Sequence, residues 1–383
     1  MKPPMRSLIR SLCLFCFSLP AVAQVPSPPD IAARSYILYD YASQQVLAES
    51  NADQRVAPAS ITKVLTSYIV FDEIRQKRLS PDDQVLISEK AWRQGIDSSE
   101  SRMFLQVGSQ VGLEDLLRGI IVQSGNDATI AIAEHVSGSE SAFAGVMNQY
   151  AAKLGMQNSH FVDASGLPDP DHYTTARDLA ILARALIHDF PDWYTLFAER
   201  EFTWNKIRQP NRNLLLNRDP SIDGIKTGHT SEAGYCLLTS AQRDGRRLIA
   251  AVMGANSWAY REQASLELLN YGFRVFETAN LLGAGKPAQS AEVYKGAADS
   301  VEVGTLEPVS ISLLRGSSER VQISTQVNAP LVAPLAKGQA VGTATIALDG
   351  KTLKTIPLVA LVDVPEGGFF RWLIDTIRLW FGW

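Results

Sequence analysis

The spacing of hydrophobic residues along the chain predicts alternating regions of strand and helix. Two short segments, "SYILYD" and "QVLAES", flank a turn-like "YASQ" and predict a β-hairpin between Ser35 and Ser50. Helical spacing dominates from Ser60 to about His188, and alternation returns after Pro210 in "IDGIKTGHT", "GYCLLTSAQ" and "RRLIAAVMGA". A further helical segment, "REQASLELLNYGFRVFET", follows. We therefore expect an α+β fold in which one antiparallel sheet is covered by helices.

From residue 279 onward the pattern changes to short alternating segments. A linker-like stretch, "LLGAGKPAQSAEVYKGAADS", leads into "SVEVG", "VSISLLRG", "RVQISTQV", "GTATIAL" and "KTLKTIPLVALV". These segments predict a small all-β domain over residues 279–365, after a first domain over residues 24–278. No site chemistry stands out in the small domain, so we expect it to act as a spacer or an interaction module.

The last residues, 366–383, predict an amphipathic helix. In "GGFFRWLIDTIRLWFGW" the residues Arg371, Asp375, Arg378 and Gly382 recur at spacings of four, three and four, and apolar residues fill nearly all the rest. Such a helix could dock on the protein's own core, but three tryptophans with arginines on the polar stripe favour a membrane interface. It is too short to span a bilayer, which takes about 20 residues. We expect it to anchor the chain to a membrane surface.

The N-terminus, residues 1–23, has the three parts of a secretory signal peptide. Lys2, Arg6 and Arg10 form a charged region, "SLCLFCFSLPAV" is a short apolar stretch, and "AVA" before Gln24 is an A-x-A cleavage site. The apolar stretch is shorter than the roughly 20 residues that a membrane span needs. We therefore expect cleavage after Ala23 and export of the mature chain.

Composition narrows the function classes. The chain has 383 residues, of which 46% are hydrophobic, so it can bury the cores of two domains. Its net charge of −4 comes without a basic block, and we therefore expect no binding to nucleic acid. Two of the three cysteines lie in the predicted signal peptide, which leaves Cys236 in the apolar run "YCLLTS" as an expected buried structural cysteine.

The first candidate catalytic residues lie in "APASITK", where we expect Ser60 and Lys63 to project from the same face of a helix. A serine hydroxyl is a poor nucleophile until a base takes its proton, and lysine can be that base only if its pKa falls toward neutrality. A helix N-terminus and a second nearby cation would both lower that pKa. The S-x-x-K pattern also arises by chance, in which case Ser60 caps a helix and Lys63 lies in solvent.

Two further motifs follow in the chain. "QSGND" places Ser124 and Asn126 between two helical segments, and "IKTGHT" places Lys226, Thr227 and Gly228 on a predicted strand. Each has a purely structural explanation, since "SGND" can end one helix and cap the next, and "KTG" can be a solvated edge strand whose glycine allows a close approach. Together with S-x-x-K, in this order, the motifs form the signature of penicillin-binding proteins and active-site serine β-lactamases.

The chain resembles the low-molecular-mass penicillin-binding proteins that act as D-alanyl-D-alanine carboxypeptidases. The resemblance covers the signal peptide, a β-lactamase/transpeptidase-like catalytic domain, the β-rich domain and a C-terminal anchor ending in "RLWFGW". The tracts "GLPDPDHYTTARDLA" and "WNKIRQPNRN" are also similar to sequences of the family. One departure is the middle motif, S-G-N in place of S-D-N, which keeps the serine and the asparagine.

The resemblance implies a covalent mechanism without a cofactor or a metal. Ser60 would attack the carbonyl of the penultimate D-alanine, Lys63 would accept its proton, and an acyl-enzyme would form as the terminal D-alanine leaves. Ser124 would relay a proton between Lys63 and the leaving amine, and Asn126 would hold the substrate's amide side chain. Water would then hydrolyse the acyl-enzyme, whereas a β-lactam would acylate Ser60 and clear slowly.

The resemblance also implies a set of substrate-binding residues, which are Asn126, Lys226, Thr227, Gly228, His229 and Arg261. Lys226 would be the second cation near Lys63, and Thr227 and Arg261 would bind the terminal carboxylate. Backbone N–H groups of Ser60 and His229 would form the oxyanion hole. The implied partners are peptidoglycan stem peptides ending in D-Ala-D-Ala, β-lactams, and the periplasmic surface of the bacterial inner membrane.

Other functions remain open at this point. A β-lactamase or a D,D-endopeptidase would share the fold, although the additional glutamate of class A β-lactamases has no convincing counterpart in this chain. A zinc peptidase would use ligands from "SHFVDASGLPDPDH", namely His160, Asp163, Asp169, Asp171 and His172. Against zinc, the segment lacks HExxH spacing, and its glycine and prolines predict a loop. Against a wall-binding module without catalysis, the nucleophile, both lysines and Ser124 are all present.

Overall fold

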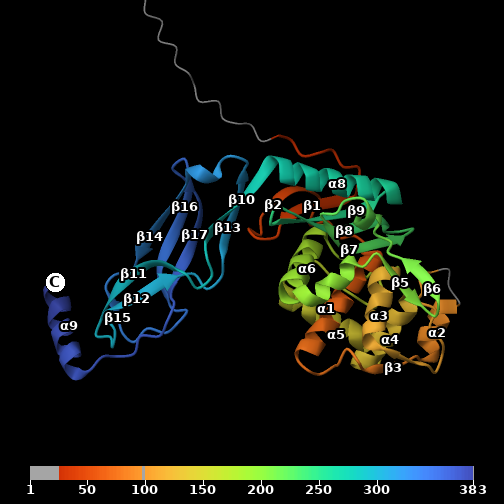
Figure 1. The fold of residues 1–383 in the computed structure, drawn as a ribbon, viewed down its shortest axis with the longest axis horizontal. Helices are drawn as coiled ribbons and strands as arrows, with labels where there is room; N and C mark the ends of the chain where they lie inside the picture. The colour runs from red at the N-terminus through yellow and green to blue at the C-terminus, as the bar shows by residue number, and fades with distance from the viewer. Residues whose placement is uncertain (1–25, 97–99, 383) are drawn as a thin grey trace, which may run out of the picture.

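The computed structural model describes residues 26–96 and 100–382 (Figure 1). The predicted signal peptide, residues 1–23, lies outside the described residues. Figure 1 shows the helices up to α8 and the five-stranded sheet gathered at one end of the molecule, with the β-rich domain beside them and α9 at the other end.

A five-stranded antiparallel sheet forms the centre of the first domain, in the order β2-β1-β9-β8-β7. Its strands are β1 (Ser35–Asp40), β2 (Val46–Ser50), β7 (Ile222–Thr230), β8 (Gly234–Arg243) and β9 (Arg246–Ala255). The β8–β9 turn has positive φ angles at Asp244 and Gly245, as a two-residue type I′ hairpin requires. The predicted antiparallel sheet is therefore confirmed, and β7 lies at its edge.

Helices cover both faces of this sheet. Along β9, alternate side chains pack into two different hydrophobic clusters, one on each face. Ile249, Ala251 and Met253 belong to one hydrophobic cluster, whereas Leu248 and its alternate neighbours belong to the cluster beneath α8 (Trp258–Val275). Figure 1 shows α8 on one face and several other helices on the other. Those helices are α1 (Lys63–Arg75), α3 (Leu113–Arg118), α4 (Asn126–Ser137), α5 (Glu140–Leu154) and α6 (Ala176–Asp189).

Helix α1 lies at the centre of the larger cluster. All ten residues from Lys63 to Asp72 are buried, so the helix has no solvent-facing side along that length. A single 3₁₀ turn, η1 (Ala59–Thr62), precedes it. The fold therefore holds the S-x-x-K segment in a packed and fixed position.

Short strands and turns lie within the region predicted as mainly helical and also after its predicted end at about His188. Strands β3 (Gln84–Leu86) and β4 (Gln110–Gly112) pair with each other, as do β5 (Glu201–Trp204) and β6 (Ile207–Pro210). The remaining short elements are α2 (Glu89–Ile96), α7 (Pro191–Tyr194), the π-helical turn η2 (Gly119–Gln123), and the 3₁₀ turns η3 (Thr195–Ala198) and η4 (Leu214–Asn217).

The second domain is all-β, as predicted. Strands β10 (Phe276–Leu282) and β13 (Val309–Leu314) form one pair, and six strands form a sheet in the order β14-β16-β17-β12-β11-β15. The six are β11 (Pro287–Tyr294), β12 (Ser300–Gly304), β14 (Val321–Val327), β15 (Leu331–Val332), β16 (Ala340–Leu348) and β17 (Lys351–Ala360), with a 3₁₀ turn η5 (Ser318–Arg320) before β14.

Two details of the predicted chain path were wrong. The helix expected over "REQASLELLNYGFRVFET" ends at Val275, and its last three residues begin β10. The linker-like stretch contains the end of β10 and all of β11. In β11 the side chain of Val293 is fully buried while most of the strand is not, so the strand lacks a clear hydrophobic alternation.

Helix α9 (Phe369–Phe381) ends the described chain and is amphipathic, as predicted. It contacts the β-rich domain through its polar stripe, in which Asp375 is 1% exposed. Its apolar side chains are exposed instead, and Phe370 and Trp380 reach 79% and 84%. Of the helices described, none is long and apolar enough to cross a membrane.

Candidate active site

Ser60 and Lys63 meet at the junction of a 3₁₀ turn and a long helix. Ser60 lies in η1, and Lys63 is the first residue of α1, so the predicted single helix is two joined helical segments. The residue before Ser60, Ala59, has a φ angle of 48°, which costs energy for a side chain with a Cβ and marks a strained backbone. Lys63 Nζ lies 3.0 Å from Ser60 Oγ, within hydrogen-bond distance.

Three oxygen atoms surround the Lys63 amine. Besides Ser60 Oγ, Nζ donates hydrogen bonds to Asn126 Oδ1 at 2.7 Å and to the Ser165 carbonyl oxygen at 2.9 Å. The residue is 1% exposed, and this burial lowers the pKa of Lys63 to about 7. A lysine with that pKa is partly neutral at physiological pH and can therefore act as a general base.

The S-G-N motif connects η2 to α4, as the sequence predicts. Ser124 has a left-handed φ of 67° and is buried against the active-site cavity, and Asn126 is the first residue of α4. A Cβ at Gly125 would come within 2.9 Å of the Met103 backbone nitrogen. This close approach explains the glycine at the one position where the motif departs from S-D-N.

Asp127 lies in the first turn of α4 and does not act as its N-cap, which is Gly125. Its carboxylate accepts hydrogen bonds from the backbone nitrogens of Met103 at 2.8 Å and Leu105 at 3.1 Å, besides that of Ala128. These hydrogen bonds hold residues 103–105 in place, directly after Glu100 and Ser101, which line the cavity. Glu100 in turn accepts a hydrogen bond from the Asn126 side-chain nitrogen, so the amide of Asn126 is held at both ends.

The K-T-G motif lies on the edge strand β7, next to η1. A Cβ at Gly228 would come within 2.8 Å of the Pro58 carbonyl oxygen, so only glycine lets β7 lie this close to η1. Lys226 is buried and donates a hydrogen bond to the Thr227 carbonyl oxygen at 3.2 Å. Burial and then the neighbouring charge of Lys63 lower the pKa of Lys226 well below its ordinary value.

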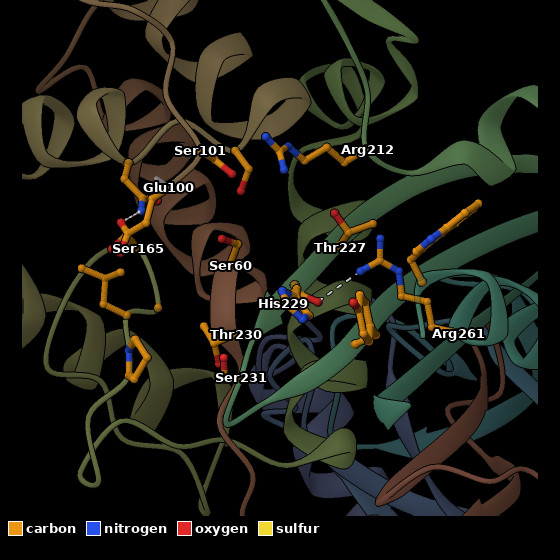
Figure 2. A pocket seen from close by; sticks show the side chains of 18 of the residues that line it. Ser60, Glu100, Ser101, Ser165, Arg212, Thr227, His229, Thr230, Ser231 and Arg261 are labelled. Atoms are coloured by element: carbon orange, nitrogen blue, oxygen red, sulfur yellow. Dashed lines mark hydrogen bonds between the residues drawn. The ribbon is translucent and has the colours of Figure 1, made fainter. Parts of the chain in front are cut away.

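Two arginines add positive charge on either side of Thr227 (Figure 2). Arg261, in the first turn of α8, donates hydrogen bonds to the carbonyl oxygens of Gly228 at 3.2 Å and Cys236 at 3.4 Å. Arg212 follows β6 and donates from Nε to the Gln123 carbonyl oxygen at 3.0 Å. Their charges add to the lowering of the Lys226 pKa, and together they suit an anionic ligand.

The predicted residues surround one cavity of about 920 Å³ (Figure 2). Its lining includes Ser60, Ser124, Asn126, Thr227, Gly228, His229 and Arg261. Lys63 and Lys226 are buried behind this lining, and the hydrogen bonds of Lys63 reach Ser60 and Asn126. The structure therefore brings together all nine residues that the sequence analysis selected.

Some groups in the site were not selected from the sequence. Arg212 lies in the tract "WNKIRQPNRN", which the family resemblance singled out, so a signal for it was present. Glu100 had no such signal. The carbonyl oxygen of Ser165 is a backbone group, and residue identity does not reveal where a backbone group points.

The proposed zinc ligands have other partners. The Asp163 carboxylate accepts hydrogen bonds from backbone nitrogens of its own loop, His172 lies 2.9 Å from the Thr62 hydroxyl, and His160 contacts the Asp171 carbonyl oxygen. Within residues 26–96 and 100–382, no group of three or more His, Cys, Asp or Glu side chains is arranged to hold a metal ion. The geometry gives the zinc peptidase hypothesis no support.

Comparison with known proteins places the chain in a family. Residues 22–257 match the peptidase S11 family, D-alanyl-D-alanine carboxypeptidase, and residues 276–366 match the C-terminal domain of penicillin-binding protein 5. D-alanyl-D-alanine carboxypeptidase DacA of Escherichia coli (strain K12) is 46% identical over 366 residues, which cover 94% of this chain and 91% of that protein.

Comparison with solved structures also identifies penicillin-binding proteins as similar. Penicillin-binding protein 5 from Haemophilus influenzae is 43% identical, with a TM-score of 0.84 and coverage of 89% of this chain and 100% of that one. Penicillin-binding protein D2 from Listeria monocytogenes, in an ampicillin-bound form, is 28% identical, with a TM-score of 0.58 and coverage of 64% and 100%. The chain belongs to the D-alanyl-D-alanine carboxypeptidase family of penicillin-binding proteins, which are cell-wall hydrolases. The resemblance inferred from the three motifs is confirmed.

Proposed function

We propose that the chain removes the terminal D-alanine from peptidoglycan stem peptides through an acyl-enzyme on Ser60. The observation that carries this proposal is the contact of Ser60 Oγ with a buried lysine whose pKa is about 7. The same cavity contains Thr227 and Arg261, which can bind the carboxylate at the end of such a peptide.

The surroundings of Lys63 direct its lone pair toward Ser60. A neutral amine has two N–H donors and one lone pair, and both Asn126 Oδ1 and the Ser165 carbonyl oxygen can only accept. When they take the two N–H groups, the lone pair is left for the Ser60 hydroxyl. Ser60 Oγ then bonds to the substrate carbonyl carbon as its proton passes to Lys63.

Departure of D-alanine requires a proton on its nitrogen. Ser124 lines the cavity, as Asn126 does, and we assign to its hydroxyl the transfer of that proton from Lys63 to the leaving amine. The backbone N–H groups of Ser60 and His229 are assigned to the oxyanion, an interaction worth about 3 kcal/mol when one such donor is removed from other enzymes. Water then adds to the acyl carbon and releases Ser60.

The cations select the substrate. Thr227 and Arg261 are assigned to the terminal carboxylate, and the guanidinium of Arg212 makes this end of the cavity more positive. A β-lactam carries a comparable carboxylate and a strained amide, so it should acylate Ser60 as well. Penicillin-binding protein D2 of Listeria monocytogenes is known in an ampicillin-bound form, which supports this proposal by similarity.

The test is incubation with a pentapeptide ending in D-Ala-D-Ala, with release of D-alanine as the measurement. Wild type should release D-alanine and Ser60→Ala should not, although both remain folded. Activity that survives Ser60→Ala and vanishes with EDTA would contradict the proposal and point to metal chemistry. Turnover of a penicillin adduct within seconds would point to a β-lactamase, and absence of any adduct would point to a wall-binding module.

We also propose that α9 holds the protein at a membrane surface. Its support is the orientation of the helix, because the polar stripe faces the β-rich domain and the aromatic face points outward. An apolar face with tryptophans and arginines suits the bilayer interface. Deleting residues 369–383 should move the protein to the soluble fraction without changing its rate of acylation by penicillin, and persistent membrane association would contradict the anchor.

Export is the third part of the proposal, and it rests on residues 1–23 alone. Cleavage after Ala23 would release a mature chain that begins at Gln24 and folds on the periplasmic side of the inner membrane. N-terminal sequencing of the protein from a membrane fraction measures this directly. A mature protein that still begins at Met1 would contradict it.

A further inference from the structure

The 163–167 loop is bound to the first turns of α1 by its carbonyl oxygens. The Ser165 carbonyl oxygen accepts a hydrogen bond from Lys63 Nζ at 2.9 Å, and the Ala164 carbonyl oxygen accepts one from Thr66 Oγ1 at 2.7 Å. Thr66 and Lys63 are both fully or almost fully buried. The shape of this loop therefore decides whether a backbone oxygen reaches the Lys63 amine.

The Asp163 carboxylate accepts hydrogen bonds from groups within its own loop. Its Oδ1 accepts hydrogen bonds from the backbone nitrogens of Ser165 and Gly166, both at 2.6 Å, and from the Ser165 hydroxyl at 3.0 Å. Its Oδ2 lies 3.3 Å from His172 Nδ1, and His172 Nε2 lies 2.9 Å from Thr62 Oγ1. Asp163 is thus connected to the catalytic turn twice, through the loop backbone and through the buried imidazole.

The loop also tolerates little movement. Gly166 has a φ angle of 89°, and a Cβ added there would lie 1.8 Å from the Ala59 carbonyl oxygen. Ala59 is the strained residue directly before Ser60. Displacement of the loop would therefore disturb both members of the Ser60–Lys63 pair.

We propose that Asp163 is a positioning residue for Lys63, which shapes the loop that presents the Ser165 carbonyl oxygen and places a negative charge beside the amine. The inference rests on the proposed function, in which Lys63 is the base that deprotonates Ser60. It gives a role to two residues, Asp163 and His172, which otherwise serve neither a metal nor the substrate.

Charged and titratable groups from several parts of the chain interact with Lys63. The carboxylates are Asp163, Glu100 and Asp127, the cation is Arg212, and the other titratable groups are Lys226 and His172. Burial lowers the pKa of Lys63, and Asp163 opposes that lowering more than the other charges do. Although burial acts against it, the hydrogen bonds from His172 and the loop hold the pKa of Asp163 well below its usual range. Asp163 is therefore ionised wherever the enzyme works.

The Asp163→Asn variant distinguishes the effect of the negative charge of Asp163 from its effect on the conformation of the 163–167 loop. The asparagine keeps an oxygen that accepts the loop N–H groups but carries no charge, so the pKa of Lys63 should fall further and the amine should become neutral at lower pH. The measurement is the second-order rate constant for acylation by benzylpenicillin across the neutral pH range. We expect the rising limb to move about one pH unit toward acid, with little loss of the maximum rate.

Asp171→Asn is the matched control, because Asp171 belongs to the same segment and is exposed. It should leave the pH profile unchanged. Asp163→Ala removes the oxygen as well, so its maximum rate should also fall, and Asp163→Asn decides the matter alone if this second variant does not fold.

The outcomes are distinct from those of the proposed function. Failure of benzylpenicillin to acylate the wild type would overturn the proposed function itself. Acylation of the wild type with an unmoved profile in Asp163→Asn would overturn only the inference. An equal rate loss at every pH would also overturn it, because Asp163 would then shape the loop without setting the protonation of Lys63.

Discussion

Burial brings the pKa of Lys63 to about 7, and the rate of acylation should follow this ionisation. Only the neutral amine can take the proton of Ser60, so the rate should rise as pH increases through about 7. The measurement is the rate of labelling by a fluorescent penicillin as a function of pH, with the final extent of labelling as the control for folding. A midpoint close to the ordinary lysine value of 10.5 would contradict the role of Lys63 as base.

The close packing around Gly228 allows a prediction from steric contact alone. In Gly228→Ala the new Cβ would meet the Pro58 carbonyl oxygen at 2.8 Å, so β7 must move away from η1, which contains Ser60. A displacement of about 1 Å at a reacting group costs up to roughly a hundredfold, so we expect acylation to slow by about tenfold to a hundredfold. The measurement is the rate of penicillin labelling.

Gly145→Ala is the matched control for Gly228→Ala, because a Cβ there meets nothing within 4 Å. It lies within α5, where alanine is preferred to glycine by about 1 kcal/mol, so stability should rise slightly and acylation should not change. Equal rates for the two variants would show that the close approach of β7 to Pro58 is unimportant.

Side-chain identity predicts this site well because its chemistry depends on side chains at short and regular spacings. Ser60 and Lys63 are three residues apart, and each of the other two motifs is a run of three residues. What the sequence does not reveal are backbone groups, such as the Ser165 carbonyl oxygen on Lys63, and partners brought in from far along the chain, such as Glu100 on Asn126.

At the scale of elements, α9 shows an interaction that periodicity alone does not predict. A helical pattern identifies a polar and an apolar face, but it does not say which face contacts the rest of the protein. Asp375 Oδ2 accepts a hydrogen bond from the Lys295 backbone nitrogen at 2.6 Å and pairs with Arg371 at 2.7 Å. Arg378 pairs with Glu292 on β11 at 2.9 Å. The polar stripe therefore binds the helix to the domain and turns the aromatic face outward.

Replacement of Asp375 should release the helix. Asp375→Asn loses the charge that holds two arginines, so α9 should detach more often and its backbone amides should exchange about tenfold faster. Hydrogen–deuterium exchange of residues 369–381 in detergent-free buffer measures this.

Asp349→Asn is the control for Asp375→Asn, because it removes an exposed partner of Arg320 that should contribute little. Indistinguishable exchange in Asp375→Asn and wild type would show that the polar stripe does not hold α9. Exchange that is faster throughout the chain would instead indicate general unfolding and would also contradict the prediction.

At the scale of the whole molecule, the candidate active site and the proposed membrane anchor lie in different parts of the chain. Every residue that lines the cavity lies between Ser60 and Glu262, within the first domain. The β-rich domain contacts that domain away from the cavity, for example where the Ser312 backbone nitrogen donates to Gln45 Oε1 at 2.6 Å and Arg246 donates to the Phe276 carbonyl oxygen at 2.7 Å. Figure 1 shows α9 at the far end of the β-rich domain.

The sequence predicted this organisation because each part has a distinct pattern. Helical and alternating segments gave the α+β and all-β folds, with β1 and β8–β9 starting and ending within a residue or two of the predicted segments. The pattern was weakest for β11, whose strand is stabilised by pairing with β12 and β15 more than by burial of its side chains. Strand pairing between distant segments is a property of the folded chain, so a local pattern does not contain it.

The most direct test of the account is the position of the penicillin adduct. Trypsin cuts after Arg55 and Lys63, so residues 56–63, "VAPASITK", form one peptide with Ser60 as its single serine. After reaction with benzylpenicillin, mass spectrometry should find the adduct on Ser60 in wild type and none in Ser60→Ala. An adduct on another residue, or one that persists in Ser60→Ala, would contradict the central claim that Ser60 is the nucleophile.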